Sequence, residues 1–104
     1  MCRSVEAAKY ILNRYMEEDK PISNLELQKK LSEIEKSYSN EEGKRFFDEE
    51  FEKWEIGDVI PEVYYKFVRF GVDPIYLPKG IRFDETKINL PDVKKKFIEK
   101  ELAI

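Results

Sequence analysis

Histidine is absent from this sequence, and its absence removes more chemistry than any other feature of the composition. Without histidine there is no Ser-His-Asp or Cys-His nucleophilic site, and the commonest general base is missing. The single cysteine, Cys2, excludes an internal disulfide and a four-thiolate zinc site, and we expect it to lie in a frayed terminus. Only carboxylate chemistry or magnesium binding stays open, because aspartate and glutamate together number 22.

Long apolar runs are missing as well. No stretch of about 18 apolar residues occurs, so a membrane-spanning helix is not expected. The first residues become acidic at Glu17, Glu18 and Asp19, where a signal peptide would need its apolar core and cleavage site. We therefore expect a cytoplasmic protein with no membrane partner.

The residues that are present predict one folded domain over residues 1–104. Hydrophobic residues make up 41% of the chain and aromatic residues 13%, enough for a core. A first helix is predicted over about residues 4–18, with Ser4 as its N-cap. A second is predicted to begin at residue 24, because Ser23 and Glu26 form a capping box. Helical spacing gives each helix one apolar side, formed by Val5, Ala8, Ile11, Leu12, Tyr15 and Met16 in the first and by Leu27, Leu31, Ile34 and Tyr38 in the second.

The second half of the chain predicts a short β element and two further helices. We expect a brief extended or hairpin segment ending at GDV (57–59), then a helix begun by Pro61 and stopped by Gly71. Residues 72–90 are expected to form a small β-pair or an ordered loop. Pro91 opens the last helix. The spacing places Val63, Tyr64, Phe67, Val68, Val93, Phe97, Ile98 and Leu102 inward and Lys94, Lys95, Lys96 and Lys100 largely outward.

The predicted fold class is therefore mainly α. We expect a compact single domain of about four helices with a small β-hairpin or short strand pair.

Charge is spread unevenly along the chain. Residues 41–58, called the acidic segment below, contain eight acidic and three basic residues, a local charge of −5 in a chain of net charge −3. They form no D-x-D or E-x-x-H pattern, and no phosphate-binding glycine loop accompanies them, so we expect no enzymatic activity. A solvated face and a surface that engages a basic partner are both compatible with this charge.

Two helices joined by a short turn are also the first half of a helix-turn-helix. A DNA-binding protein of this kind needs a third, basic helix that enters the major groove, but the acidic segment follows the second helix instead. Phosphates would repel that segment. A small DNA-binding transcriptional regulator is therefore the alternative function, and nucleic-acid binding is disfavoured.

Three stretches in order, AAKYILNRY, ISNLELQKKL and FDEEFEKWEIGDVIPEVYYKF, resemble the Panacea domain, also described as a GepA-like, phage-associated domain. The resemblance covers about residues 4–71, and the chain diverges after it. Asp58 stands where the family usually has proline. The positions that match the family's motifs are Leu27, Gln28, Lys29, Leu31, Phe47, Phe51, Trp54, Gly57, Val59, Pro61, Tyr64 and Phe67.

The resemblance implies a bacterial or phage antitoxin that neutralises a toxin by direct binding. Some members are adaptors for regulated proteolysis, and no cofactor or catalytic residue is established in the family. We therefore expect a non-enzymatic protein-binding inhibitor, either an antitoxin of a toxin–antitoxin system or a phage-encoded inhibitor of a bacterial defence system, such as an anti-CRISPR protein. Its partner would be a toxin or a host defence effector, it would need no cofactor or metal, and the sequence leaves its oligomeric state open.

Two sets of residues follow from this expectation. The expected partner-binding residues are Gln28, Lys29, Glu33, Asp48, Glu49, Glu50, Glu52, Glu55 and Asp58. The residues expected to build the scaffold are Leu27, Leu31, Phe51, Trp54, Gly57, Pro61, Tyr64 and Phe67.

Overall fold

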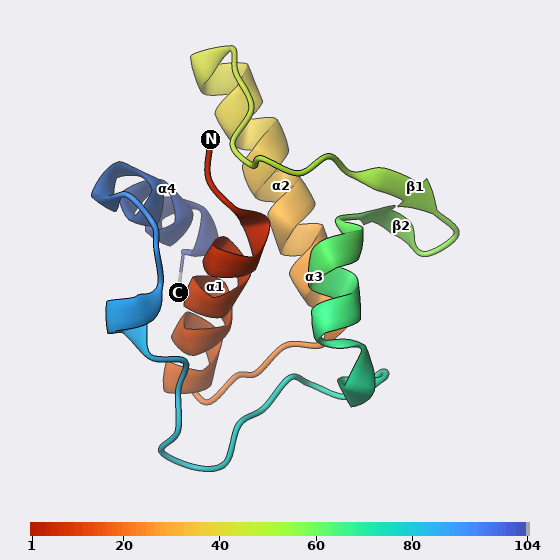
Figure 1. Ribbon diagram of the computed structural model, residues 1–104, viewed down its shortest axis with the longest axis vertical. Helices are drawn as coiled ribbons and strands as arrows, with labels where there is room; N and C mark the ends of the chain where they lie inside the picture. Colours follow the sequence, from red (N-terminus) through yellow and green to blue (C-terminus); the bar gives the residue numbers. More distant parts are fainter. Residues whose placement is uncertain (104) are drawn as a thin grey trace.

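Helices surround a small core in the computed structural model, which describes residues 1–103 (Figure 1). Within those residues the elements are α1 (Ser4–Glu17), α2 (Asn24–Glu42), β1 (Glu52–Trp54), β2 (Gly57–Val59), α3 (Pro61–Lys66) and α4 (Asp92–Leu102). Short 3-10 turns occupy Val68–Phe70 and Glu85–Lys87. The predicted class, mainly α with a small antiparallel hairpin, is confirmed. None of the helices in this range is long and apolar enough to cross a membrane.

The first helix, α1, is the central helix of the fold. It packs against α2, α3 and α4, and Figure 1 shows it between α4 and α3. The sequence predicts one buried side, but α1 is buried on nearly all sides, including polar Asn13 at 0% exposure and Glu6 at 9%. The prediction is incomplete because these polar side chains bind loops that come from the far end of the chain. A helical pattern in sequence does not record such distant partners.

The N-terminus of α1 is capped from a distance. Ser4 lies inside the first turn and Arg3 occupies the N-cap position without a side-chain cap, so the predicted Ser4 cap is wrong. The Glu49 carboxylate instead accepts a 2.8 Å hydrogen bond from the Ser4 backbone N–H. A carboxylate is favourable there because it satisfies a free N–H at the positive end of the helix dipole.

Cys2 is anchored and not frayed. Its backbone N–H donates to the Phe46 carbonyl at 2.9 Å, its own carbonyl accepts from the Asp48 N–H at 2.7 Å, and its side chain is buried. The Glu35 carboxylate holds the same loop by accepting from the N–H groups of Phe46 (2.7 Å) and Phe47 (3.2 Å). The start of the chain is therefore part of the core.

The second helix begins as predicted. The Glu26 N–H donates to Ser23 Oγ at 3.1 Å and the Ser23 N–H donates to Glu26 Oε1 at 2.9 Å, which is the expected capping box. The helix continues to Glu42. It ends where Gly43 adopts a φ of 68°, a left-handed conformation that favours glycine.

The hairpin pairs Glu52 with Val59, Lys53 with Asp58 and Trp54 with Gly57. Gly57 has a φ of 117°, which L-residues rarely adopt. Val59 is fully buried, and β2 packs against α2. The predicted extended segment ending at residues 57–59 is confirmed.

The scaffold residues expected from the sequence all support this region. Leu27, Leu31 and Phe67 are buried, Phe51 packs against the core, Pro61 opens α3, and the Trp54 ring lies 5.1 Å from that of Tyr64. The helix is shorter than predicted, since α3 ends at Lys66 and a 3-10 turn continues to Gly71. Val68, predicted inward, is 47% exposed because this change of helix type turns it outward.

Residues 72–90 form an ordered loop whose apolar residues Ile75, Ile88 and Leu90 are buried. Of the two predicted alternatives, the ordered loop is present and the β-pair is not. The loop instead forms a single antiparallel bridge, between Ser23 and Pro74. Asn13 binds the loop with both amide atoms, donating to the Phe83 carbonyl and accepting from the Phe83 N–H, each at 2.9 Å.

The last helix is rotated relative to the prediction. Val93 is 70% exposed and Lys94 only 8%, so the predicted orientations of both residues are wrong. The Lys94 ammonium lies 4.0 Å from the ring centre of Tyr38 and 4.6 Å from that of Phe46, and these cation–π contacts accommodate the charge in the core. The long aliphatic stem of Lys94 makes the apolar contact that the helical spacing predicted for Val93.

Candidate functional site

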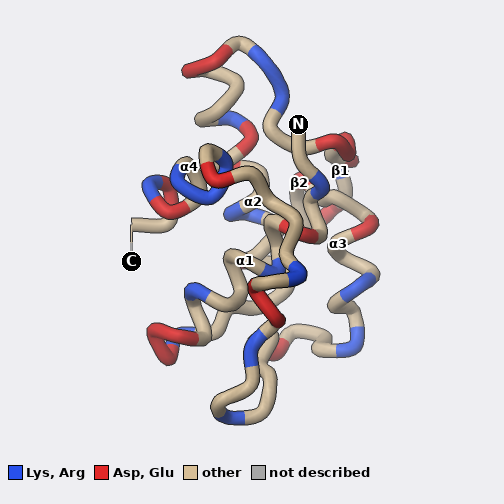
Figure 2. Tube along the Cα trace, turned by 60° about the vertical axis from the view of Figure 1, so that its left-hand side comes forward, with Lys and Arg blue, Asp and Glu red and all other residues tan. Residues whose placement is uncertain are grey.

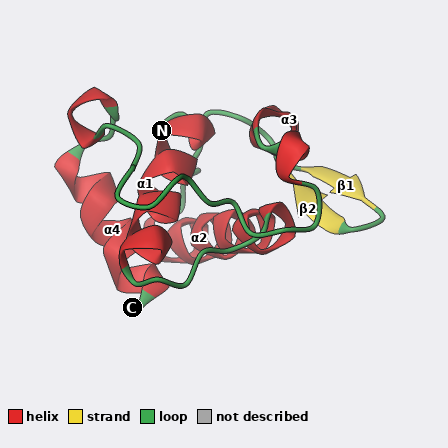
Figure 3. Ribbon diagram, turned by 90° about the horizontal axis from the view of Figure 1, so that it is seen from below, coloured by secondary structure: helices red, strands yellow, loops and turns green. Residues whose placement is uncertain are grey.

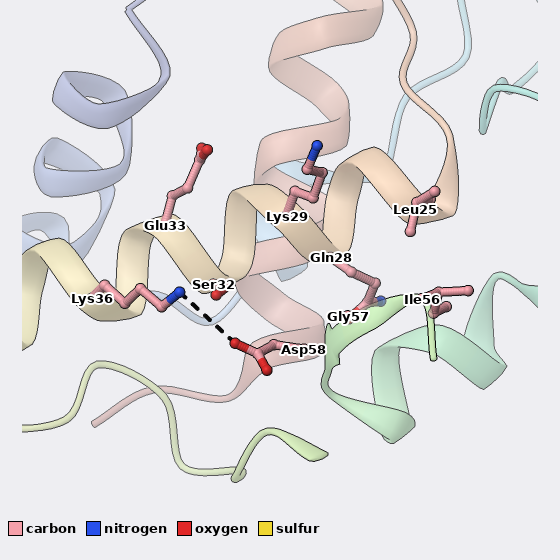
Figure 4. Close-up of a pocket in the computed structure, with 9 residues that line it drawn as sticks. All are labelled: Leu25, Gln28, Lys29, Ser32, Glu33, Lys36, Ile56, Gly57 and Asp58. Atoms are coloured by element: carbon pink, nitrogen blue, oxygen red, sulfur yellow. Dashed lines mark ion pairs between the residues drawn. The ribbon is translucent and has the colours of Figure 1, made fainter. Parts of the chain in front are cut away.

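A groove lies between the second helix and the hairpin (Figure 4). Its volume is about 270 Å³. We call it the α2–hairpin groove, and it is lined by Leu25, Gln28, Lys29, Ser32, Glu33, Lys36, Ile56, Gly57 and Asp58. Four of the nine partner-binding residues expected from the sequence, Gln28, Lys29, Glu33 and Asp58, therefore meet here.

Gln28 forms the floor of the groove and fixes its two walls to each other. Its Oε1 accepts from the Ile60 N–H at 3.0 Å, and its Nε2 donates to Asn24 Oδ1 at 3.2 Å. Asn24 in turn donates to the Tyr64 carbonyl at 2.9 Å. With 1% exposure, Gln28 is a structural residue, so its predicted role as a partner contact is wrong. An amide in this position satisfies the backbone N–H of Ile60, directly after the short hairpin.

Asp58 faces α2 from β2 and pairs with Lys36, with 3.8 Å between Lys36 Nζ and Asp58 Oδ2. Figure 4 shows the Lys36 side chain directed at Asp58, while the Lys29 and Glu33 side chains project from α2 away from the hairpin. A second hollow of about 180 Å³, reaching Phe51, also has Ser32, Lys36 and Asp58 in its lining. The ion pair therefore stands between two parts of one surface depression.

Two exposed apolar side chains, Leu25 and Ile56, stand on opposite walls of the groove. They are 46% and 47% exposed, and both also line an adjoining pocket of about 170 Å³. Val72, which is 94% exposed, lines that pocket with Tyr64. Leu25, Ile56 and Val72 were not predicted as contacts from the sequence. In the sequence, Leu25 could have been recognised because it lies off the buried stripe of α2, and Ile56 because it occupies a hairpin turn.

The acidic segment does not form one surface. Glu49 caps α1, Glu50 lies 3.9 Å from Arg45, and Glu41 lies 3.2 Å from Lys100. Glu52 accepts from the Trp54 indole N–H, and Glu55 is exposed in the hairpin turn. Figure 2 shows acidic residues interspersed with basic ones along the chain. Of the expected contacts within the acidic segment, Asp58 lines the groove, while Asp48, Glu49 and Glu50 lie elsewhere.

The hydrogen bond to Ser4 also affects the ionisation of Glu49. Partial burial on its own raises the pKa of this carboxyl, but hydrogen bonds, first among them the one from the Ser4 N–H, together outweigh it and hold the pKa below its usual value. Burial raises the pKa of the Cys2 thiol to about 12, which removes the thiolate at neutral pH. Both groups lie outside the groove.

Residues 1–103 provide little support for a metal site or for a DNA-binding site. In the range 1–103 no three His, Cys, Asp or Glu residues are grouped so that they could hold a metal ion. The helix that follows α2 is α3, which has six residues and carries one acid, Glu62, and one base, Lys66. It lacks the basic surface that a recognition helix needs.

Comparisons of the chain with protein families, with curated proteins and with solved structures found no match. The resemblance to the Panacea domain therefore stays a prediction from the sequence.

Proposed function

We propose that this protein is a non-enzymatic inhibitor that binds a protein target through the α2–hairpin groove. The observation that carries the proposal is the pair of exposed apolar side chains, Leu25 and Ile56, on opposite walls of a groove with a charged rim. Protein interfaces combine an apolar centre with a polar, solvated rim in this way. Lys29, Glu33 and Lys36 provide that rim here.

The openness of the groove also favours a protein target over a small molecule. Small-molecule sites usually enclose about 300–1,000 Å³ and bury most of their ligand. A groove of about 270 Å³ that is open to solvent suits side chains presented by another protein.

The class of target comes from the resemblance. Similarity to the Panacea domain supports a toxin or a host defence effector, such as a CRISPR nuclease, as the partner, reached in the cytoplasm of a bacterium or of an infected cell. Binding alone would inhibit such a target, so the proposal requires no catalytic residue.

Two experiments test this function. Co-expression with toxins encoded beside the gene should restore growth, and expression in hosts that carry CRISPR or restriction systems should raise phage plating. The proposal predicts an effect in at least one of the two. If no toxin is neutralised and plating is unchanged in every defended host, the inhibitor function is wrong.

A further inference from the structure

Residues 76–81 form a turn that reaches beyond the helices at one end of the molecule (Figure 1 and Figure 2). The Ile81 N–H donates to the Pro78 carbonyl at 2.8 Å, which among residues 1–103 is the only backbone–backbone hydrogen bond of this turn. Lys79 and Gly80, at the tip, are both exposed, and Gly80 has a φ of 85°. The turn can therefore open without breaking backbone hydrogen bonds to the rest of the fold.

The chain is held firmly on both sides of the turn. Before it, Ile75 is fully buried and its N–H donates to the Ile22 carbonyl at 2.8 Å. After it, Asn13 binds both backbone groups of Phe83. Local opening is thus confined to the turn itself.

We propose that the Lys79–Gly80 peptide bond is a proteolytic processing site for peptidases that cut after lysine or arginine, and that the cut protein stays assembled. Hydrolysis consumes one water and leaves a carboxylate on Lys79 and an amine on Gly80. Exposed loop tips are preferred sites of such cuts, because a peptidase must draw its substrate segment into an extended conformation. This property is independent of the proposed inhibitor function.

The other basic residues are less suited to a first cut. Most lie in helices or strands, which would have to unwind. Lys20 is followed by proline, which lacks the N–H of an ordinary residue. Lys44 and Arg45 are exposed, but the next residue, Phe46, is fully buried. The guanidinium of Arg82 is bound to the end of α1.

Contacts that cross the cut hold the two pieces together. Arg14 pairs with Glu85 at 2.9 Å and with Glu99 at 3.2 Å, both on the C-terminal piece. That piece also buries four apolar side chains in the core, Ile88, Leu90, Ile98 and Leu102. Both walls of the α2–hairpin groove belong to the other piece, so the cut complex keeps the groove.

The cut changes how the fold responds to dilution. A fold made of two chains depends on their concentration, whereas an uncut chain does not. When the C-terminal piece leaves, Tyr38 and Phe46 lose their contacts with Phe97 and Lys94 of α4. One cut at this turn therefore makes loss of α4 possible without cutting any helix.

Limited digestion with trypsin, followed by mass spectrometry, locates the first cut. We expect pieces 1–79 and 80–104 to appear first, and Lys79→Gln to be cut at least about tenfold more slowly. Lys44→Gln is the matched control, because it removes another exposed lysine outside the helices, and should be cut at the wild-type rate. Circular dichroism checks that both variants are folded. A first cut elsewhere, or equal rates for the two variants, would overturn the site.

The isolated cut protein tests whether the pieces stay assembled. Under native conditions it should elute in size-exclusion chromatography at the position of the intact protein, and its melting temperature should fall on dilution while that of the intact protein stays constant. Separate elution of the two pieces, or a melting temperature that does not change with concentration, would show that they do not form the proposed complex.

Discussion

Buried polar side chains on α1 and α2 hold the irregular parts of this small protein in place. Asn13 binds both backbone groups of Phe83, and Glu35 binds two consecutive N–H groups of the loop at Phe46. Gln28 accepts a hydrogen bond from the backbone N–H of Ile60. Each of these side chains replaces a secondary-structure partner that the loop lacks, so removing one leaves buried backbone groups without hydrogen bonds.

Asn13 gives the first prediction at the residue scale. Asn13→Ala should lower the free energy of unfolding by about 2 kcal/mol, because it leaves the N–H and carbonyl of Phe83 unpaired. Urea denaturation followed by circular dichroism measures this loss. Asn89→Ala is a matched control, since the Asn89 side chain is exposed and should change stability little. Equal stability of the two variants would refute the role given to Asn13.

Cys2 gives the second prediction at the residue scale. Because burial raises the pKa of its thiol to about 12, alkylation by iodoacetamide at pH 8 should be at least about a hundredfold slower in the folded protein than in urea. The measurement is unambiguous because Cys2 is the only cysteine of the chain. Similar rates in the two states would show that the N-terminus is frayed.

At the scale of elements, capping decides where helices begin. The second helix is capped locally by Ser23 and Glu26, whereas α1 is capped by Glu49 from a loop that is 45 residues away in sequence. The two helices therefore differ in how they respond to loss of the surrounding fold. The first helix loses its cap as soon as the loop at Glu49 separates from it.

The cap on α1 predicts an acid dependence of stability. The pKa of Glu49 is lower in the folded protein than in the unfolded chain, so its stabilising contribution is complete above the unfolded pKa and is lost as the pH falls through the folded value. Glu49→Gln should cost about 1 kcal/mol at pH 7, and the difference from wild type should shrink below about pH 4.

Urea titrations across this pH range measure the effect of Glu49→Gln. Glu50→Gln is the control, because its exposed carboxylate makes only a 3.9 Å contact with Arg45 and should change stability little at any pH. A difference between wild type and Glu49→Gln that stays constant from pH 7 to pH 3 would contradict the account of the cap.

The same distinction between local and distant contacts explains what could be predicted from the sequence. The capping box at Ser23, the hairpin and the start of α3 at Pro61 follow from neighbouring residues, and all were predicted. The cap on α1 and the burial of Lys94 depend on segments far away in sequence, so local patterns predicted them incorrectly.

The candidate site shows the same limit. Acidic and polar residues can be counted in a sequence, and this led to Lys29, Glu33 and Asp58 at the groove. The apolar residues Leu25 and Ile56 come from different elements and become neighbours only when the hairpin packs on α2. No spacing rule connects a residue near the start of a helix with one in a later turn.

At the scale of the whole molecule, packing leaves the groove accessible. The last helix contacts the C-terminal half of α2 through Tyr38 and Glu41, and the hairpin contacts the earlier part through Gln28 and Lys36. Figure 3 shows α4 and the hairpin on different sides of the fold. The groove is thus lined by α2 and the hairpin, as the proposed binding of a target there requires.

The most direct measurement of the central claim is the affinity of the target for two apolar-to-acidic variants. Ile56→Asp changes the groove, and Val93→Asp changes an even more exposed apolar residue on α4. Isothermal titration with the toxin or effector that responds in cells should give at least tenfold weaker binding for Ile56→Asp and wild-type affinity for Val93→Asp. Wild-type affinity of Ile56→Asp, or equal losses in both variants, would contradict the proposal that this groove binds the target.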